Sequence, residues 1–278
     1  MNLGSFTRLA VAALALAWSS GAAPARASGS DTGLSTGESH MVTVSANPTA
    51  GVEANMPRDG AYARAIELDS KMRWDDSYTA YSQAIGEFRK MISKRPRWKK
   101  MIELWIEKAE YMRSQSSRLR TSRYYRRYYY RYRYRNPSYR WRRAEAMHNK
   151  WLAIRAFTGR APRALLDKVI ADYTFVLGRT TSYPQAQLSL AALYHEVGQH
   201  DKGQRLFKKL PKAQYRHSWR ASYVAYYYAA AGNARMALKY LRKAMTYSRS
   251  STQRVMRQSN DFDRLRSHPE FRRLLGEK

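Results

Sequence analysis

The sequence predicts an all-α protein in which helical hairpins stack in series. Three observations support this prediction: apolar residues recur at helical spacing after Gly60, stop signals separate the segments, and one set of residues recurs after 34 positions. Hydrophobic residues make up 44% of the 278 residues, enough for a sizeable core despite a formal net charge of +30. A charge of this size concerns the partners of a protein rather than its fold.

The first 27 residues have the features of a secretory signal peptide. A short start ends in Arg8, an apolar run extends from Leu9 to Trp18, and small residues precede a cleavage site after Ala27. The apolar run is shorter than the roughly 20 residues that a membrane-spanning helix needs. The chain contains no cysteine, which excludes disulfides, thiolate chemistry and a lipid anchor on cysteine. We therefore expect an exported, periplasmic protein that is not a lipoprotein.

Residues 28–60 are rich in Ser, Thr, Gly and Ala, which predicts a flexible linker. The linker contains GLSTG, Gly33 to Gly37, which matches the G-x-S-x-G pattern of hydrolase nucleophiles. That pattern requires a strand before the serine and a helix after it, and the linker predicts neither. We therefore assign no catalytic role to this motif.

The helices predicted after the linker are each apolar on one face only. Pro96 separates the first two apolar stripes, and Pro162 and Gly178 bound a third, as is typical of helix starts and ends. Helices of this kind must be buried against neighbours. The stripes consist of Tyr81, Ala84, Ile85, Phe88, Met91 and Ile92, then Trp98, Met101, Trp105, Ala109 and Met112, then Leu165, Leu166, Val169, Ile170, Tyr173, Val176 and Leu177.

A period of 34 residues links two hairpins in the C-terminal half. Gly198 and Gly232 are placed to turn the chain between the helices of each pair. Gly203 and Ala237 allow the second helix to sit close to the first. The two sets are Leu190, Ala191, Tyr194, Gly198, Gly203 and Phe207, and then Val224, Ala225, Tyr228, Gly232, Ala237 and Leu241.

At these residues the sequence resembles the tetratricopeptide repeat (TPR) superfamily. Residues 80–96, AYSQAIGEFRKMISKRP, resemble the second half of another repeat, and residues 261–275, DFDRLRSHPEFRRLL, are similar to the capping helix of bacterial arrays. The resemblance implies a right-handed alpha-solenoid of about five to six TPR-like helical hairpins. Residues 61–117 would form degenerate N-terminal hairpins, and residues 144–278 would form the C-terminal hairpins with their cap. It also implies a protein or peptide partner held in the groove.

The first helices of TPR hairpins line the inner groove, so the resemblance also implies which residues meet the partner. A mixture of aromatic and polar types suits an extended peptide or a partner helix. The alternative is that the aromatic side chains only pack between helices. Leu188 and Ala192 occupy the places where some members clamp a C-terminal carboxylate with Lys and Asn, so we do not expect that mode. The groove residues are Gln185, Leu188, His195, Trp219, Ser222 and Tyr226.

Residues 118–143 form an Arg/Tyr-rich insertion with eleven Arg and eight Tyr, and no acidic residue lies between Glu110 and Glu145. Guanidinium groups bind phosphate or carboxylate in bidentate fashion, and tyrosine rings stack on flat groups. The insertion therefore suits an anionic envelope polymer or surface, such as glycolipid, phospholipid or peptidoglycan, with nucleic acid less expected in an exported protein. The candidate contacts are Arg123, Tyr124, Arg126, Arg127, Tyr130, Arg131, Arg133, Arg135, Arg140 and Trp141.

Two other interpretations of the insertion stay open. YYYRYRYR alternates with a period of two, so it could pair as a small hairpin or remain a solvated arm. Tyr and Arg side chains also stack on one another through cation–π contacts, and the segment would then contribute packing only.

The sequence shows no catalytic or metal-binding constellation. HEVGQH, His195 to His200, resembles the zinc motif HExxH, but the second histidine comes five residues after the first and Gly198 interrupts the helix. We therefore expect the two imidazoles not to share a face, and we expect no metal, no cofactor and no enzymatic activity. The leading hypothesis is a non-enzymatic protein-binding scaffold or adaptor of the bacterial envelope. The alternative is a direct binder of an anionic polymer or surface.

Overall fold

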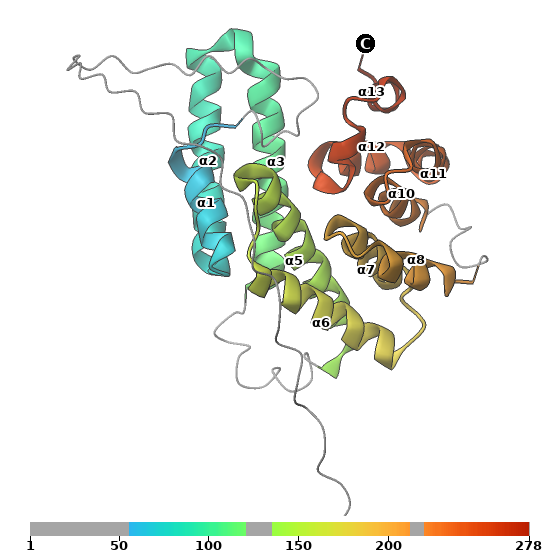
Figure 1. Ribbon diagram of the computed structural model, residues 1–278. Helices are drawn as coiled ribbons and strands as arrows, with labels where there is room; N and C mark the ends of the chain where they lie inside the picture. Colours follow the sequence, from blue (N-terminus) through green and yellow to red (C-terminus); the bar gives the residue numbers. More distant parts are fainter. Residues whose placement is uncertain (1–55, 121–134, 212–219, 278) are drawn as a thin grey trace, which may run out of the picture. The chain divides into compact units, whose positions relative to one another are not determined.

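The computed structural model describes residues 56–120, 135–211 and 220–277, which belong to the compact unit Val44–Lys278. Every regular element in these ranges is an α-helix or a short 3-10 helix (Figure 1). The all-α prediction is therefore confirmed for this part of the chain. The predicted signal peptide and most of the predicted linker lie outside the described residues.

Three helices form the N-terminal part of the described chain: α1 (Gly60–Ser70), α2 (Trp74–Lys94) and α3 (Lys99–Leu119). The 3-10 helix η2 (Pro96–Trp98) connects the two long helices, at the proline that separates their apolar stripes in the sequence. α2 packs against both α1 and α3. The stripes face the interior, where Tyr62 lies edge to face with Tyr81 at a ring-centroid distance of 5.4 Å.

The folded part begins inside the predicted linker. Met56 is buried, and Gly60 is already the first residue of α1. Gly60 adopts a φ of +84°, and the backbone N–H of Ala61 donates to Glu87 Oε2 at 3.2 Å. The predicted linker end at residue 60 is therefore too late, because a buried apolar side chain and a glycine turn anchor the chain ahead of α1.

The middle of the described chain contains α5 (Pro137–Thr158) and α6 (Arg163–Arg179), which pack against each other. Asn136 caps α5 by accepting a hydrogen bond from the backbone N–H of Ser138 at 2.8 Å. Pro137 stands in the first turn, where its missing N–H costs nothing. The helix ends at Gly159, which adopts a φ of +79°.

The sequence predicts an irregular insertion over residues 118–143, but the two ends of this segment are helical. The prediction is therefore wrong at those ends. Arg118 belongs to α3, and residues 137–143 belong to α5. The Asn-Pro cap starts α5 inside the basic run, and Arg140 and Arg143 both form ion pairs with Asp172 of α6. The Asp172 side chain has no exposed surface, so these pairs offset the repulsion between the two arginines. Residues 121–134 lie outside the described residues.

Four helices contain the 34-residue period: α7 (Pro184–Glu196), α8 (His200–Lys208), α10 (Ala221–Ala230) and α11 (Ala234–Tyr247). α7 packs on α8, α10 packs on α11, and α7 also packs on α10. Gly198 and Gly232 each adopt a φ of +78° in the turns between paired helices. These contacts are those of adjacent helical hairpins, and the right-handed TPR arrangement stays a prediction.

The C-terminal segment consists of α12 (Arg249–Gln258), η5 (Asn260–Leu265) and α13 (Pro269–Leu275). η5 packs on α10 and on α5, and α12 contacts α3. Lys108 of α3 donates to the backbone carbonyl of Gln258 at 2.6 Å and to Asn260 Oδ1 at 2.7 Å. The C-terminal segment therefore covers helices from earlier in the chain and does more than cap the last hairpin.

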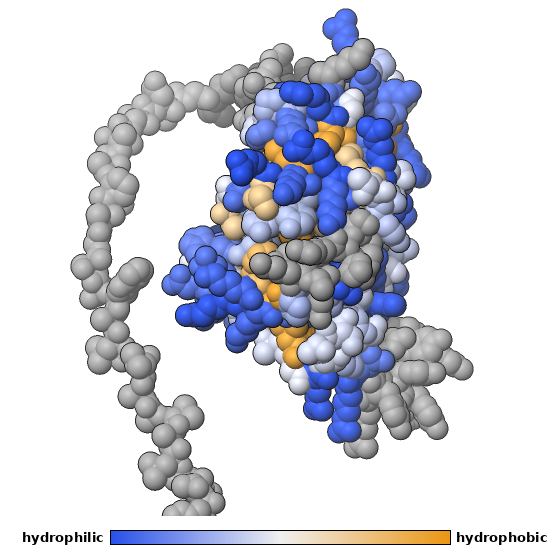
Figure 2. Space-filling view, turned by 90° about the vertical axis from the view of Figure 1, so that its right-hand side faces the viewer, coloured by the Kyte–Doolittle hydropathy of each residue, from blue (hydrophilic) through white to orange (hydrophobic). Residues whose placement is uncertain are grey.

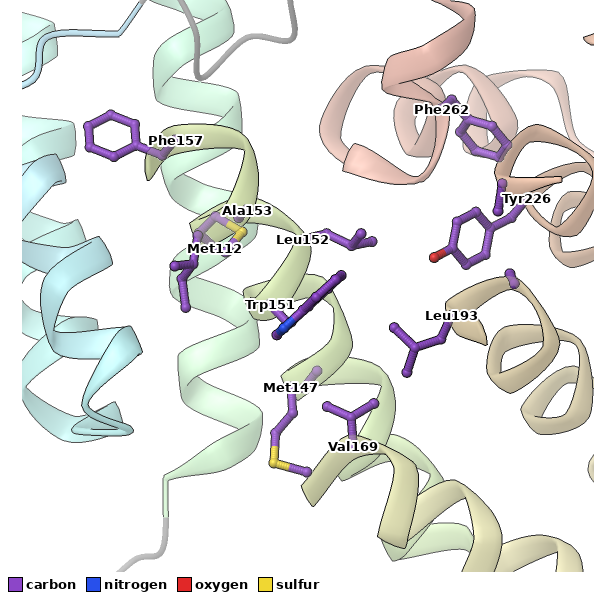
Figure 3. Packing of buried hydrophobic residues seen from close by; sticks show 14 of the residues in the cluster. Met112, Met147, Trp151, Leu152, Ala153, Phe157, Val169, Leu193, Tyr226 and Phe262 are labelled. Atoms are coloured by element: carbon purple, nitrogen blue, oxygen red, sulfur yellow. The ribbon is translucent and has the colours of Figure 1, made fainter. Parts of the chain in front are cut away.

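One hydrophobic cluster extends through these helices. Figure 3 shows Leu152 of α5, Leu193 of α7, Tyr226 of α10 and Phe262 of η5 around the space between their helices. The face seen in Figure 2 is mostly hydrophilic, with apolar side chains in separate patches. None of the helices in the described ranges has both the length and the apolar content that crossing a membrane takes.

A buried ion pair joins α1 to α5. Lys150 Nζ lies 2.7 Å from Asp69 Oδ2, and neither side chain has any exposed surface. Tyr81 donates to the same carboxylate oxygen at 2.6 Å, and Lys150 also donates to Ser116 Oγ at 2.7 Å. Because α1, α2, α3 and α5 each supply one member, this network fixes how the four helices meet.

Candidate functional site

A polar cavity of about 300 Å³ lies where α3, α5, α6, α7, α10, α12 and η5 meet. We call it the central cavity. Its volume is at the small end of the range for ligand pockets. Polar side chains from six of these elements converge on this space, and α12 adds the apolar Val255. The polar residues are four tyrosines, two carboxylates, a histidine, an arginine and several amide or hydroxyl groups: Tyr111, Gln115, Arg118, Glu145, His148, Asn149, Tyr173, Ser189, Ser222, Tyr223, Tyr226 and Asp261.

Helical spacing places these side chains. Tyr111, Gln115 and Arg118 are three or four residues apart on α3, and therefore share one face of that helix. Glu145 and His148 have the same relation on α5. On the other side, α10 contributes its own polar face, and η5 adds Asp261 because the C-terminal segment packs over α5 and α10.

Two buried tyrosines bracket His148. Its Nδ1 lies 3.3 Å from the Tyr173 hydroxyl, and its Nε2 lies 3.0 Å from the Tyr226 hydroxyl. Burial, helped by the charge of Arg155, lowers the pKa of His148 to about 3, so the imidazole is neutral at physiological pH. A neutral imidazole donates through one nitrogen and accepts through the other, which matches one tyrosine on each side.

Glu145 holds a carboxylate at the cavity wall. Tyr223 donates to Glu145 Oε1 at 2.8 Å, and Arg118 Nη1 comes only within 3.9 Å of Oε2. Burial raises the pKa of Glu145, and the tyrosine hydrogen bond and the nearby arginines Arg118 and Arg142 partly offset that rise.

Asp261 supplies the second carboxylate. Burial raises its pKa to about 7, and the charges of Glu145 and Glu196 add to this, while a hydrogen bond from Ser259 and the charge of Lys108 oppose it. No ion pair joins Asp261 to a lysine or arginine within the described ranges. The cavity therefore contains an acidic group that changes protonation near neutral pH.

Gln115 lines the cavity with an unsatisfied acceptor. Its side chain is 1% exposed, and Nε2 donates to Ser114 Oγ at 3.3 Å. Oε1 has no hydrogen-bond partner among the described residues. Buried acceptors of this kind are rare in folded proteins, and each calls for a physical explanation.

The open groove implied by the TPR resemblance is not present at the residues assigned to it. Leu188 has no exposed surface, and Gln185, His195 and Tyr226 are also buried. The reason is that α7 packs directly on α10 and that η5 covers α10. Ser222 is partly exposed and, with Tyr226, lines the central cavity. Trp219 lies outside the described residues.

Most of the residues assigned to anionic-partner binding lie outside the described residues: Arg123, Tyr124, Arg126, Arg127, Tyr130, Arg131 and Arg133. Arg135 is exposed and precedes Asn136, the residue that caps α5. Arg140 forms an ion pair with Asp172 and lies 4.6 Å from the Phe175 ring centroid, while Trp141 packs against Tyr183 at a ring-centroid distance of 5.5 Å. Both side chains therefore join α5 to its neighbours, and a role of either one in binding an anionic partner stays a prediction.

His195 and His200 come together, against the expectation from their spacing. The two Nδ1 atoms are 3.0 Å apart, because the turn at Gly198 returns the chain and places His200 at the start of α8 beside the end of α7. Across the described ranges, no group of three His, Asp or Glu side chains is arranged to hold a metal ion.

Sequence reasoning missed Glu145, His148 and Asp261 as site residues. One signal was available: Glu145 is the first acidic residue after a long basic stretch, and His148 follows it at helical spacing. The contribution of Asp261 depends on a contact between distant parts of the chain, for which the sequence carries no local signal.

The chain matches no family model, no curated protein and no solved structure.

Proposed function

We propose that the protein is a non-enzymatic binding protein and that the central cavity is its binding site. The observation that supports this most is the convergence of polar side chains from six elements on one cavity of about 300 Å³. Such a cavity accepts a small polar ligand or a polar group that projects from a partner. In this proposal the TPR-like hairpins are the scaffold, and the site is enclosed between them rather than open along a groove. Export to the periplasm would place the ligand in the cell envelope.

A cavity-filling variant tests the proposal. Ser222 is partly exposed on the cavity lining, so Ser222→Trp would fill the space with little disturbance of the helix. Ser250→Trp on the exposed surface of α12 is the matched control. The melting temperature is measured with a panel of small amines, carboxylates, alcohols and sugars. We expect at least one panel member to stabilise the wild-type protein and S250W but not S222W. Equal responses from all three proteins would overturn the proposal.

A second candidate function is binding to an anionic surface, and the region where α2 ends and α3 begins favours it. Seven lysine and arginine side chains there are exposed, with no acidic residue between Glu87 and Glu103. Positive clusters of this density are attracted to anionic lipid headgroups. The cluster consists of Arg89, Lys90, Lys94, Arg95, Arg97, Lys99 and Lys100.

Vesicle sedimentation tests this second function. The triple variant K94Q/R95Q/R97Q is compared with K202Q/R205Q/K208Q, which removes equal charge from the exposed face of α8. A deletion of residues 121–134 tests the contribution of the Arg/Tyr-rich insertion. We expect binding to phosphatidylglycerol vesicles to fall steeply with salt and to be weakened by the first variant and the deletion more than by the α8 variant. The deletion removes five arginines, and each triple variant removes three positive charges. Equal loss in the two triple variants, with a loss in the deletion that follows its larger charge change, would mean that net charge alone is responsible.

A further inference from the structure

The central cavity offers a ligand several hydrogen-bond acceptors, and the tyrosine hydroxyl groups do not compete for them. The hydroxyl groups of its four tyrosines already have partners in neighbouring side chains. Burial raises the pKa values of Tyr173, Tyr223 and Tyr226 well above 10, so these groups stay protonated and keep those bonds. Acceptor capacity remains on the Gln115 amide oxygen and on the two carboxylates.

Among the described residues, neither carboxylate has a lysine or arginine within hydrogen-bonding distance. Arg118 approaches Glu145 only to 3.9 Å, and its own side chain is half exposed. Asp261 forms no ion pair with a described lysine or arginine, although Lys108 lies close enough to influence its charge. A positive group in the cavity would supply the missing compensation.

Aromatic rings form much of the remaining wall. Tyr111, Tyr173, Tyr223, Tyr226 and Phe262 all line the cavity. The face of an aromatic ring attracts a cation, and its carbon atoms provide apolar contact for a short aliphatic stem.

We propose that the central cavity binds a primary ammonium group carried on a short apolar stem. This inference rests on the proposed function and names its ligand class. An ammonium group provides three N–H donors and a positive charge, which match the Gln115 oxygen and the carboxylates of Glu145 and Asp261. The stem would contact the tyrosine rings. A free alkylamine and the side chain of a lysine residue share this chemistry.

Two other ligand types fit the same cavity less well. A quaternary ammonium would satisfy the aromatic rings, but it has no N–H to donate to Gln115 Oε1. An anion would gain Arg118 but would meet Glu145 and Asp261 in the same confined space. Both become controls in the experiment.

Isothermal titration calorimetry with the full chain tests the inference. The probe is n-pentylamine, and its controls are choline, pentanoate and 1-pentanol. We expect binding of pentylamine alone, and a loss of affinity of about tenfold or more in Glu145→Gln and in Asp261→Asn, because each removes a charged hydrogen-bond acceptor. Nα-acetyl-lysine methylamide, tested beside pentylamine, distinguishes a lysine side chain from a free amine as the source.

Substitutions at two arginines of α3 separate the effect of a charge at the cavity wall from that of a charge elsewhere on the helix. Arg118→Gln removes the cation at the cavity wall, so pentylamine should bind several-fold more tightly. Arg113→Gln is the matched control, because Arg113 is on the same helix but does not line the cavity. Weaker pentylamine binding in R118Q would overturn the inference.

Proton exchange on binding provides an independent readout. Because a bound ammonium favours the ionised form of Asp261, its pKa falls from about 7 and protons are released near neutral pH. His148 does not contribute, since its pKa is about 3. The heat of binding, measured in buffers of different ionisation enthalpy, should show that protons are released on binding. D261N should reduce the number of protons released. Proton uptake would contradict the inference. The charged or titratable groups around Asp261 in the described ranges are Lys108, Tyr111, Arg118, Glu145, His148, Arg155, Tyr173, Glu196, Tyr223, Tyr226, Asp263 and Arg264.

The same probes separate failure of the inference from failure of the proposed function. If pentanoate, pentanol or choline binds wild-type protein but not S222W, the cavity is a binding site and the ammonium assignment is wrong. If no probe distinguishes wild type from S222W, both the assignment and the cavity as a binding site are overturned.

Discussion

Gly203 controls how closely α8 approaches α7, and replacing it with alanine tests the geometry of this hairpin. A Cβ atom at position 203 would lie 2.6 Å from the backbone oxygen of Ala191 and 2.7 Å from Cδ2 of His195. The imidazole could rotate, but the backbone oxygen belongs to the fully buried part of α7, so α8 would have to move outward.

The expected magnitude follows from two opposing effects. Overpacking of this severity costs about 3 kcal/mol, and alanine gains about 1 kcal/mol over glycine in a helix, which leaves a net destabilisation of about 2 kcal/mol for G203A. Gly86 in α2 is the control, because a Cβ there meets nothing within 4 Å. G86A should therefore be stabilising by about 0.5–1 kcal/mol.

Urea denaturation followed by circular dichroism measures both variants. The two free energies of unfolding should differ by about 2.5–3 kcal/mol, with wild type between them. In thermal melts G203A should unfold about 4–8 °C below wild type. If G203A is as stable as wild type, α7 and α8 do not approach as closely as described. If G86A is as destabilised as G203A, helix propensity and local crowding have been misjudged.

Three further predictions concern buried charge. Lys150→Met leaves the Asp69 carboxylate buried without its ion pair, so the free energy of unfolding should fall by about 3–5 kcal/mol, measured by urea denaturation. A loss of less than about 1 kcal/mol would contradict the buried network. Asp172→Asn removes the charge shared by two arginines of α5 and should destabilise by a similar amount, with native-state hydrogen exchange rising first in α5 and α6. Because the pKa of Asp261 is raised to about 7, the native state binds a proton there more tightly than the unfolded chain does. The stabilisation from that proton is complete below about pH 4 and is lost as the pH rises through about 7. Asp261→Asn should flatten this part of the stability curve measured by urea midpoints from pH 4 to 8, and an unchanged slope would refute the assignment.

Local features of the fold could be predicted from the sequence. The apolar stripe containing Tyr81 and Phe88 is buried in α2, and the period places Gly198 and Gly232 in turns with positive φ. Such features depend on spacing within one or two helices, so a single sequence reveals them. The Asn-Pro cap at the start of α5 was equally local, but the surrounding arginines obscured it.

The site could not be predicted in this way, because long-range packing creates it. The hydrogen bonds between Tyr223 and Glu145 and between Tyr226 and His148 each join cavity residues that are 78 positions apart in the chain. In sequence, each of these side chains is an ordinary charged or polar residue. The groove prediction depended on contacts of the same kind: α7 and η5 both pack on α10, and the assigned groove residues in the described ranges are buried or line the central cavity.

The attachment of the C-terminal segment to α3 bears on the order in which this chain completes its fold. In an open array each repeat needs only its neighbours, so unfolding can begin at either end and stop part of the way. Here Lys108 reaches hydrogen-bond partners 150 and 152 residues further along the chain, which ties early helices to the last ones made. The described helices should consequently melt as a single cooperative unit. Ribosome-bound chains that end before η5 should leave α3 and α5 open to proteolysis.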